Sequence, residues 1–257
     1  MINRTLIKSV FLMSFLIGVQ ITGGAQNEGD FSEREELRRS FQLSPGATVE
    51  VDTIYGTVDI ETTDTDRAEV YIVRSARRRE DFGSRPINIE QTPTGLVVRG
   101  ERDLSQEPAK VRHRVWLKLP RTVNLVVQRI NARVNIGEIE GTVRLARING
   151  AVNVAKAADY AEASSINGSL TMTVNRIGQR GINATDINGA VEFRLPYDLD
   201  ADVRVVGFNG SVNSEMPKTI VLEKKLREIF YARVGAGGAP ISIRDVNGSV
   251  RLAPIGQ

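Results

Sequence analysis

The stretch "SSINGSLTMTV" occupies residues 164–174 and contains the phrase from which most of the chain is built. In its core, Ile166 is followed by Asn-Gly, then by Ser169 and Leu170. Close copies begin at residues 130, 139, 148, 187, 208 and 246, and a more distant copy begins at residue 54. Recurrence of one short phrase is typical of repeat architectures. We therefore interpret the phrase as a unit of construction rather than as an isolated site.

The spacing of the copies predicts the fold class. Successive copies from residue 130 onward start 9, 18, 21 or 38 residues apart, so the unit is about 9–10 residues long and is usually doubled to about 18–21. One such unit holds a strand of about five residues and a tight turn. Apolar residues recur at every second position on either side of the phrase, as in strands with one buried face. These features predict an all-β protein, a β-solenoid of stacked two-strand coils.

The Asn-Gly pair leaves one alternative open. It is a strong signal of a two-residue hairpin turn because both residues accept positive φ, so an antiparallel β-meander or sandwich also fits. Asparagine at the same place in six copies favours the coil, because side-chain amides that stack at strand spacing can bond along a ladder. The predicted turn and ladder residues are Asn131, Asn149, Gly150, Asn167, Gly168, Asn188, Gly189, Asn209, Gly210, Asn247 and Gly248.

The N-terminus predicts export. Arg4 and Lys8 precede an apolar run, and small residues follow it, which is the pattern of a signal peptide over residues 1–25 with cleavage between Ala25 and Gln26. We expect a periplasmic or extracellular protein whose mature chain has no transmembrane segment. Arg4 and Lys8 also account for two of the three net positive charges. The basic composition therefore does not indicate nucleic-acid binding.

The mature chain is expected to form a single domain. Residues 26–40 are highly charged and are predicted to be a linker or a short helix, and residues 41–257 are predicted to be one β-strand-repeat domain. Within this domain, residues 217–234 are compatible with either strand or helix. The chain has no cysteine, so disulfides, thiolate metal sites and thiol nucleophiles are excluded.

Few residues suggest chemistry. His113 is the only histidine, and it falls on the apolar face of the strand predicted at residues 110–120, where packing is the simpler interpretation. Asp198, Asp200 and Asp202 alternate like the start of a calcium loop, but Val203 stands where that loop needs glycine. We expect a polar turn there, and we assign no catalytic, cofactor or metal site.

Two further segments have features of binding sites. The sequence "GAGGAP" at residues 235–240 could hold an anion through backbone N–H groups, but it lacks the lysine and helix of a phosphate loop, so a turn is expected. An arginine-rich segment could contact an anionic envelope polymer, although acidic neighbours balance it. Its arginines are Arg74, Arg77, Arg78, Arg79 and Arg85.

Several segments together resemble a known family. The Asn-Gly phrase, the opening "FQLSPGATVEVDTIYGTVDI", the strand end "VWLKLP" and the closing "VGAGGAPISIRDVNGSVRLA" are similar to the bacterial putative-adhesin family of exported β-strand-repeat proteins, a family of unknown function. The resemblance covers residues 41–253. It implies an extracytoplasmic, solenoid-like fold. Members commonly carry aspartate after the glycine of the phrase, whereas this chain has alanine or serine.

The sequence therefore favours a non-catalytic exported scaffold, an adhesin or a binding or structural protein of the envelope. We expect its partner to be an envelope or cell-surface protein or polymer. Two alternatives remain open. One is a polysaccharide-active β-helix enzyme, which would need acidic residues on adjacent strands. The other is an envelope-stress or regulatory interaction partner, for which the sequence offers no docking motif.

Overall fold

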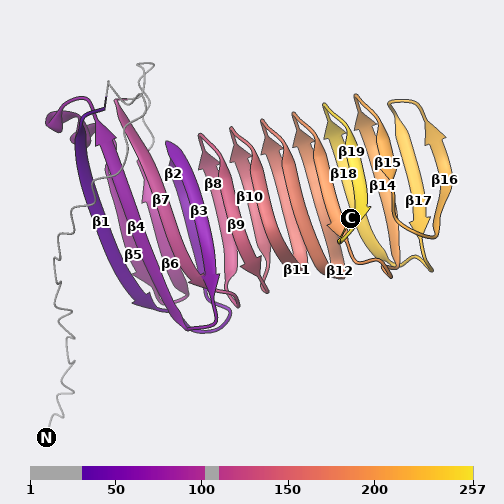
Figure 1. Cartoon of the computed structure of the whole chain (residues 1–257), viewed down its shortest axis with the longest axis horizontal. Coiled ribbons are helices and arrows are strands. Elements are labelled where there is room, and N and C mark those ends of the chain that lie inside the picture. Colours follow the sequence, from indigo (N-terminus) through magenta and orange to yellow (C-terminus); the bar gives the residue numbers. More distant parts are fainter. Residues whose placement is uncertain (1–30, 102–109, 257) are drawn as a thin grey trace, which may run out of the picture.

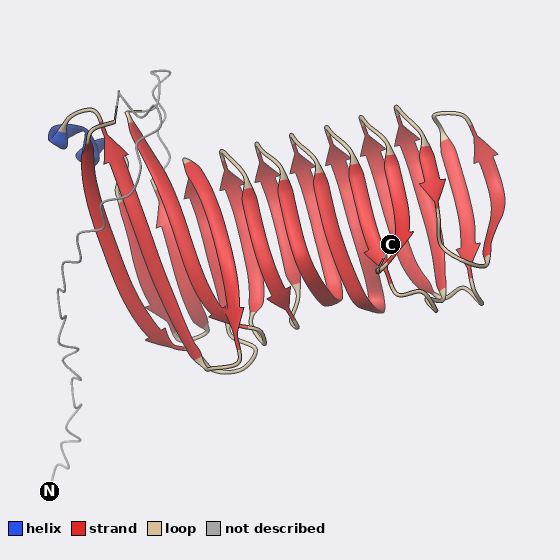
Figure 2. Ribbon diagram, in the orientation of Figure 1, coloured by secondary structure: helices blue, strands red, loops and turns tan. Residues whose placement is uncertain are grey.

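The computed structural model describes residues 31–101 and 110–256, and the side chain of residue 159 is not described. The predicted signal peptide and its cleavage site at Ala25 and Gln26 lie outside these residues. Within them the protein is all-β, with nineteen strands and one short 3-10 helix, η1 (Arg79–Ser84). Figure 2 shows the strands side by side along the long axis of the molecule.

The strands form two facing rows, each with its own order of neighbours. In the first row the order is β5 (Ile87–Thr92), β6 (Gly95–Gly100), β2 (Thr48–Ile54), β8 (Asn124–Ile130), β10 (Val143–Ile148), the second halves of β11 (Val152–Ile166) and β12 (Leu170–Ile187), β18 (Ala239–Val246), β14 (Ala201–Phe208), β17 (Ile229–Val234) and β16 (Thr219–Lys225).

The second row follows the same coils on the opposite side. Its order is β1 (Glu33–Gln42), β4 (Arg67–Ala76), β7 (Val111–Pro120), β3 (Gly56–Thr63), β9 (Val134–Ile139), the first halves of β11 and β12, β13 (Val191–Leu195), β19 (Val250–Pro254) and β15 (Val212–Ser214). Because β11 and β12 each run from the second row into the first, the two rows belong to one continuous sheet.

The central strands pair in parallel and in register with the repeat. In the first row Val143 lies opposite Leu125 on one side and Ala161 on the other, an offset of 18 residues each time. The next step, from Ala161 to Ile182, is 21 residues. Each offset is the length of one coil, which consists of a first-row strand, the Asn-Gly phrase and a second-row strand. We call the connection at the Asn-Gly phrase the bend, and the seven aligned bends the bend column.

One apolar core fills the space between the rows. Alternate residues of both rows point into it, for example Leu125 and Val127 of β8 and Val134 and Ile136 of β9, which are at most 2% exposed. The first apolar residue of each bend, such as Ile148, is buried as well. Full burial of one such side chain contributes about 1.5–3 kcal/mol, so the stack of coils stabilises what no single coil could.

The coils do not follow the order of the chain at the C-terminal end. The bend at residues 246–250 lies between those at 187–191 and 208–212, because β18 pairs with both β12 and β14, and β19 with both β13 and β15. The last strand, β19, therefore lies within the stack, between β13 and β15 (Figure 1). The copy of the phrase at residue 139 is not part of the bend column, because it connects β9 to β10, from the second row back to the first.

Antiparallel strands close the N-terminal end of the stack, and here one prediction is wrong. Residues 33–40, expected to be a linker or short helix, belong to β1, which pairs along its whole length with β4. Leu37 and Phe41 pack against the core, and the Glu35 carboxylate pairs with Arg74. Leu37 and Phe41 are four residues apart, and because the residues between them are mostly charged, the sequence did not show the alternation of a strand.

The other end is closed by a hairpin. Residues 217–234, whose sequence is compatible with strand or helix, form the strands β16 and β17, which pair antiparallel with each other, and β17 also pairs antiparallel with β14. β16 is the edge strand, and Ile220, Leu222 and Leu226 of this hairpin are more than half exposed. No helix in the described part of the chain is long and apolar enough to span a membrane.

Candidate functional site

The bend column brings the predicted asparagines together into one line of hydrogen bonds. Each side-chain amide lies over the next and donates from Nδ2 to the neighbouring Oδ1, at distances of 2.8–3.2 Å. Backbone N–H groups of the same residues donate in the same direction, as from Asn149 to the Ile130 carbonyl at 2.8 Å. The order along the line is Asn131, Asn149, Asn167, Asn188, Asn247 and Asn209.

The glycines of the bends serve close approach between coils. A Cβ atom built on Gly150 would lie 2.4 Å from the carbonyl carbon of Ala132, and one on Gly189 would lie 2.4 Å from the Gly168 carbonyl oxygen. Gly168, Gly210 and Gly248 are crowded in the same way. The backbone of each bend therefore occupies the place that a side chain on the next bend would need.

In each bend, the residue with left-handed backbone (positive φ) directly precedes the apolar residue that begins the phrase. Here φ is 54° at Arg147, 53° at Ser165 and 59° at Asp186, and the equivalent Gly207 has φ 66°. Asn-Gly suggested positive φ at the pair itself, but the backbone turns two residues earlier. Left-handed backbone in a residue with a Cβ costs roughly 1–2 kcal/mol, and the contacts within the stack have to offset this cost.

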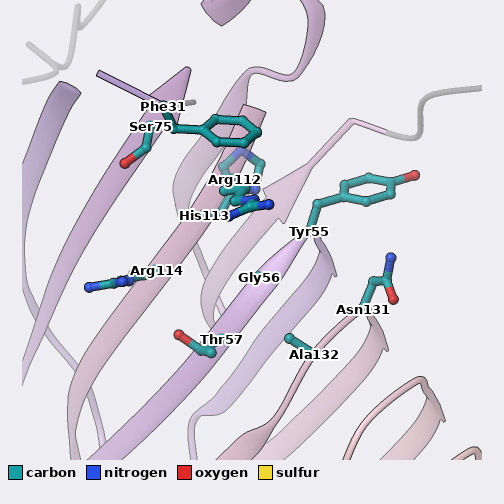
Figure 3. Close-up of a pocket in the computed structure, with 10 residues that line it drawn as sticks. All are labelled: Phe31, Tyr55, Gly56, Thr57, Ser75, Arg112, His113, Arg114, Asn131 and Ala132. Carbon is teal, nitrogen blue, oxygen red and sulfur yellow. The ribbon is translucent and has the colours of Figure 1, made fainter. Parts of the chain in front are cut away.

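A pocket opens where the line of asparagines ends, next to Asn131 (Figure 3). The bend beyond Asn131 has Tyr55 in place of asparagine, and beyond that bend the pocket is lined by Arg112, His113 and Arg114 of β7. The cavity has a volume of about 330 Å³. Its lining residues are Phe31, Tyr55, Gly56, Thr57, Ser75, Arg112, His113, Arg114, Asn131 and Ala132.

Two arginines make cation–π contacts with aromatic residues that line this pocket. The guanidinium carbon of Arg112 lies 4.2 Å from the centre of the Phe31 ring, and that of Arg85 lies 3.7 Å from the centre of the Tyr55 ring. Such contacts are worth about 0.5–2 kcal/mol each. Two arginines and no acidic residue line the cavity, so its electrostatic potential favours an anion.

Behind the pocket lies a buried cationic group. Arg74, 7% exposed, pairs with Glu35 and donates to the carbonyl oxygens of Phe82 and Arg85, the latter at 2.9 Å. His113 lies beside it, 1% exposed. Burial, with the Arg74 charge as a second cause, lowers the pKa of His113 to about 4. The imidazole is therefore neutral at neutral pH, and it packs in the wall of the pocket rather than acting from it.

Asp200 and Asp202 contact the Gly-rich segment at residues 235–240. Asp200 accepts a hydrogen bond from the Ala236 N–H at 2.7 Å, and Asp202 accepts one from the Gly238 N–H at 3.0 Å. Arg233 also donates to Asp202. The backbone N–H groups considered for an anion are thus occupied by these carboxylates. Within the described residues, no cluster of three or more His, Cys, Asp or Glu could hold a metal ion.

The arginine-rich segment does not form one surface. Arg74 and Arg85 are buried, whereas Arg78 is exposed and pairs with Glu80 and Asp81 near η1. Two carboxylates on the outer face of the second row, those of Glu138 and Glu215, pair with cations. Hydrogen bonding to Lys156 lowers the pKa of Glu138, and hydrogen bonding to Arg251 lowers that of Glu215.

Sequence reasoning missed the aromatic residues. Tyr71 of β4 and Trp116 of β7 are opposite in register and stack with ring centres 5.3 Å apart, and the Arg38 guanidinium carbon lies 5.0 Å from the centre of the Tyr71 ring. This stack lies on the outer face and stabilises the antiparallel strands. For the pocket, the available signal was two adjacent departures from the phrase, Tyr55 in place of asparagine and Ala132 in place of glycine.

No family model and no curated protein sequence matches the chain. Among solved structures, a "putative cell adhesion protein" from Clostridium sporogenes aligns over 86% of this chain and 100% of its own, at 10% identity and a TM-score of 0.46. A "putative adhesin" from Bacteroides fragilis aligns over 85% and 97%, at 8% identity and a TM-score of 0.27. One from Parabacteroides merdae aligns over 86% and 96%, at 12% identity and a TM-score of 0.29. These descriptions agree with the family that the sequence resembles.

Proposed function

We propose that this protein is an exported, non-catalytic β-solenoid scaffold of the adhesin type, which binds a molecule of the cell envelope or cell surface. The fold assignment rests on the parallel 18- and 21-residue offsets between neighbouring coils. Export rests on the signal-peptide pattern of residues 1–25. The sequence resemblance, and the descriptions of the structural neighbours as adhesins, support the same role.

The observation that carries the binding role is a long polar row on the outer face of the second row of strands. Strand pairing places polar side chains in line over seven successive strands at about 4.8 Å per strand. The row consists of Asp59, Asn135, Asn153, Thr171, Glu192, Arg251 and Asn213. An extended row of this kind, which ends near the pocket, suits an extended polymer better than a small substrate.

The ionisation of the outer carboxylates supports a non-catalytic role. A general acid for glycoside hydrolysis needs a raised pKa, whereas hydrogen bonds to Lys156 and Arg251 lower the pKa values of Glu138 and Glu215. Arg251 donates to both Glu192 and Glu215, which holds the two carboxylates as a structural pair.

The test is a screen of the full-length mature chain against a panel of envelope and surface glycans, with binding and cleavage products both measured. We expect binding without cleavage. Cleavage that Glu192→Gln or Glu138→Gln abolishes would establish the enzyme alternative instead. N-terminal sequencing of the protein isolated from its native cells tests the localisation, and a chain that starts at Gln26 is the expected result.

A further inference from the structure

The ladder of asparagines has a direction, and that direction ends at the pocket. In all five side-chain bonds, Nδ2 donates toward the coil nearer the pocket and Oδ1 accepts from the coil farther away. Asn149 is the donor to Asn131, so the Oδ1 atom of Asn131 is used and its Nδ2 group is the last donor of the line. Aligned amides polarise one another, which strengthens this terminal N–H as a donor.

A cation lies across the pocket from Asn131 (Figure 3). Arg112 is exposed, contacts the Phe31 ring and has no carboxylate partner among the described residues. Strand register adds two arginines along the outer face, because Arg114 lies opposite Thr57 and Arg133 precedes the pair formed by Val58 and Val134. Two arginines therefore line the pocket, and a third, Arg133, follows Ala132 in the chain.

The remaining lining matches a sugar ring. Thr57 and Ser75 bring hydroxyl groups, and the Tyr55 ring and the Ala132 methyl group bring apolar surface. A volume of about 330 Å³ is at the lower end of ligand pockets. Figure 3 shows Tyr55, Asn131 and Ala132 along one side of the pocket and Arg112 across from them.

We infer that this pocket binds the carboxylate of an acidic sugar unit in an envelope polysaccharide, through the Nδ2 group of Asn131 and the guanidinium of Arg112. This inference rests on the proposed binding function and names its ligand class. A carboxylate carries one charge and accepts hydrogen bonds at two oxygens, which one guanidinium and one amide can satisfy. The polymer would continue from the pocket along the polar row of the second row of strands.

The test is calorimetric titration of the full mature chain with tetragalacturonate and with its methyl ester. Asn131→Asp keeps an oxygen to accept from Asn149 but replaces the donor with a negative charge, and Arg112→Gln removes the cation. Loss of a charge-assisted hydrogen bond corresponds to a roughly tenfold or greater loss of affinity. We expect that loss in both variants and with the methyl ester.

Matched controls lie at the far end of the stack. Ser211→Asp adds the same charge beside the last bend, and Arg204→Gln removes an arginine that lies 5.3 Å from the centre of the Tyr231 ring. Both controls should bind within about twofold of the wild type, because a twofold change is within the scatter expected for distant sites. An NMR titration of the unsubstituted protein tests the same contact without relying on a variant. The side-chain NH₂ resonances of Asn131 should shift, and those of Asn209 should not.

Two results would overturn the inference. One is the absence of binding to tetragalacturonate, and the other is binding that Asn131→Asp and Arg112→Gln leave undiminished. If the glycan panel still shows binding to an uncharged polymer, the scaffold function stands while the carboxylate site falls. If nothing on the panel binds, both fall together.

Discussion

Replacing Gly189 with alanine adds one methyl group at a crowded point of the bend column. The new Cβ would lie 2.4 Å from the Gly168 carbonyl oxygen and 2.6 Å from its carbon, well inside the 3.0 Å that real Cβ atoms keep. Two hydrogen bonds hold this backbone on either side of the contact, from the Asn188 N–H to the Ile166 carbonyl and from the Leu170 N–H to the Ala190 carbonyl, at 2.8 and 2.9 Å. The obstacle cannot swing away as a side chain would.

The expected cost follows from that constraint. Overpacking of a well-packed interior costs about 1–3 kcal/mol, and a rigid backbone obstacle places Gly189→Ala at about 3 kcal/mol. For a domain of 150–250 residues, 1 kcal/mol shifts Tm by about 2–4 °C, so we expect Tm to fall by roughly 6–12 °C. Urea unfolding followed by circular dichroism measures the free energy, and a thermal scan measures Tm.

The matched control is Ala190→Ser, which adds one heavy atom at the next residue. Ala190 is exposed, and the aligned residues Ser169, Ser211 and Ser249 already have serine there. This change should stay within about 0.5 kcal/mol of the wild type. If Gly189→Ala also stays within that margin, or if the two variants are equally damaging, close approach between coils is not the reason for glycine in the bend.

Three further predictions concern the ladder and the buried charges. Asn167→Leu removes two ladder bonds and Asn209→Leu removes one, so at about 0.5–1.5 kcal/mol per bond the first should cost about twice the second in urea unfolding; equal costs would contradict the ladder. The folded state lowers the pKa of His113 from 6.5 to about 4, so its contribution is complete above pH 6.5 and is lost as pH falls toward 4. The loss amounts to about 3 kcal/mol at most. His113→Gln should flatten this decline between pH 7 and 4.5, and an unchanged slope would rule out His113 as its source. Arg74→Met leaves the buried carbonyls of Phe82 and Arg85 without their donor and should cost about 3–5 kcal/mol of unfolding free energy, whereas Arg38→Met on the surface should cost less than about 1 kcal/mol.

Much of the fold could be predicted because its signals are local. Alternation of apolar residues identified most of the strands, and the recurrence of Asn-Gly identified the places where strands connect. β1 was missed because Leu37 and Phe41 are separated by charged residues whose partners, such as Arg74 for Glu35, lie on another strand. Such pairing depends on register across the sheet, and a single segment does not specify it.

The order of the coils and the pocket could not be predicted for a related reason. The bends at residues 187–191, 208–212 and 246–250 are nearly identical in sequence, so their local pattern cannot decide which one stacks on which. The pocket combines Phe31, Tyr55, Arg112 and Asn131 from four separate segments. The only sequence signals of the pocket were two departures from the phrase, at Tyr55 and Ala132, and the stacking of the strands brings these two residues together.

The coil formed by β18 and β19 lies between two coils that are synthesised before it. The strands β14 and β15 are made before β18 and β19, yet they contact the rest of the stack mainly through them. Until residues 239–254 emerge during synthesis, the stack ends at β12 and β13, and the segment from Ala201 to Val234 has no coil to rest on. Removal of the last nineteen residues would therefore remove one coil from within the stack and expose the surfaces of the coils on both sides of it. The C-terminal segment therefore joins the strands β14 and β15 to the rest of the stack.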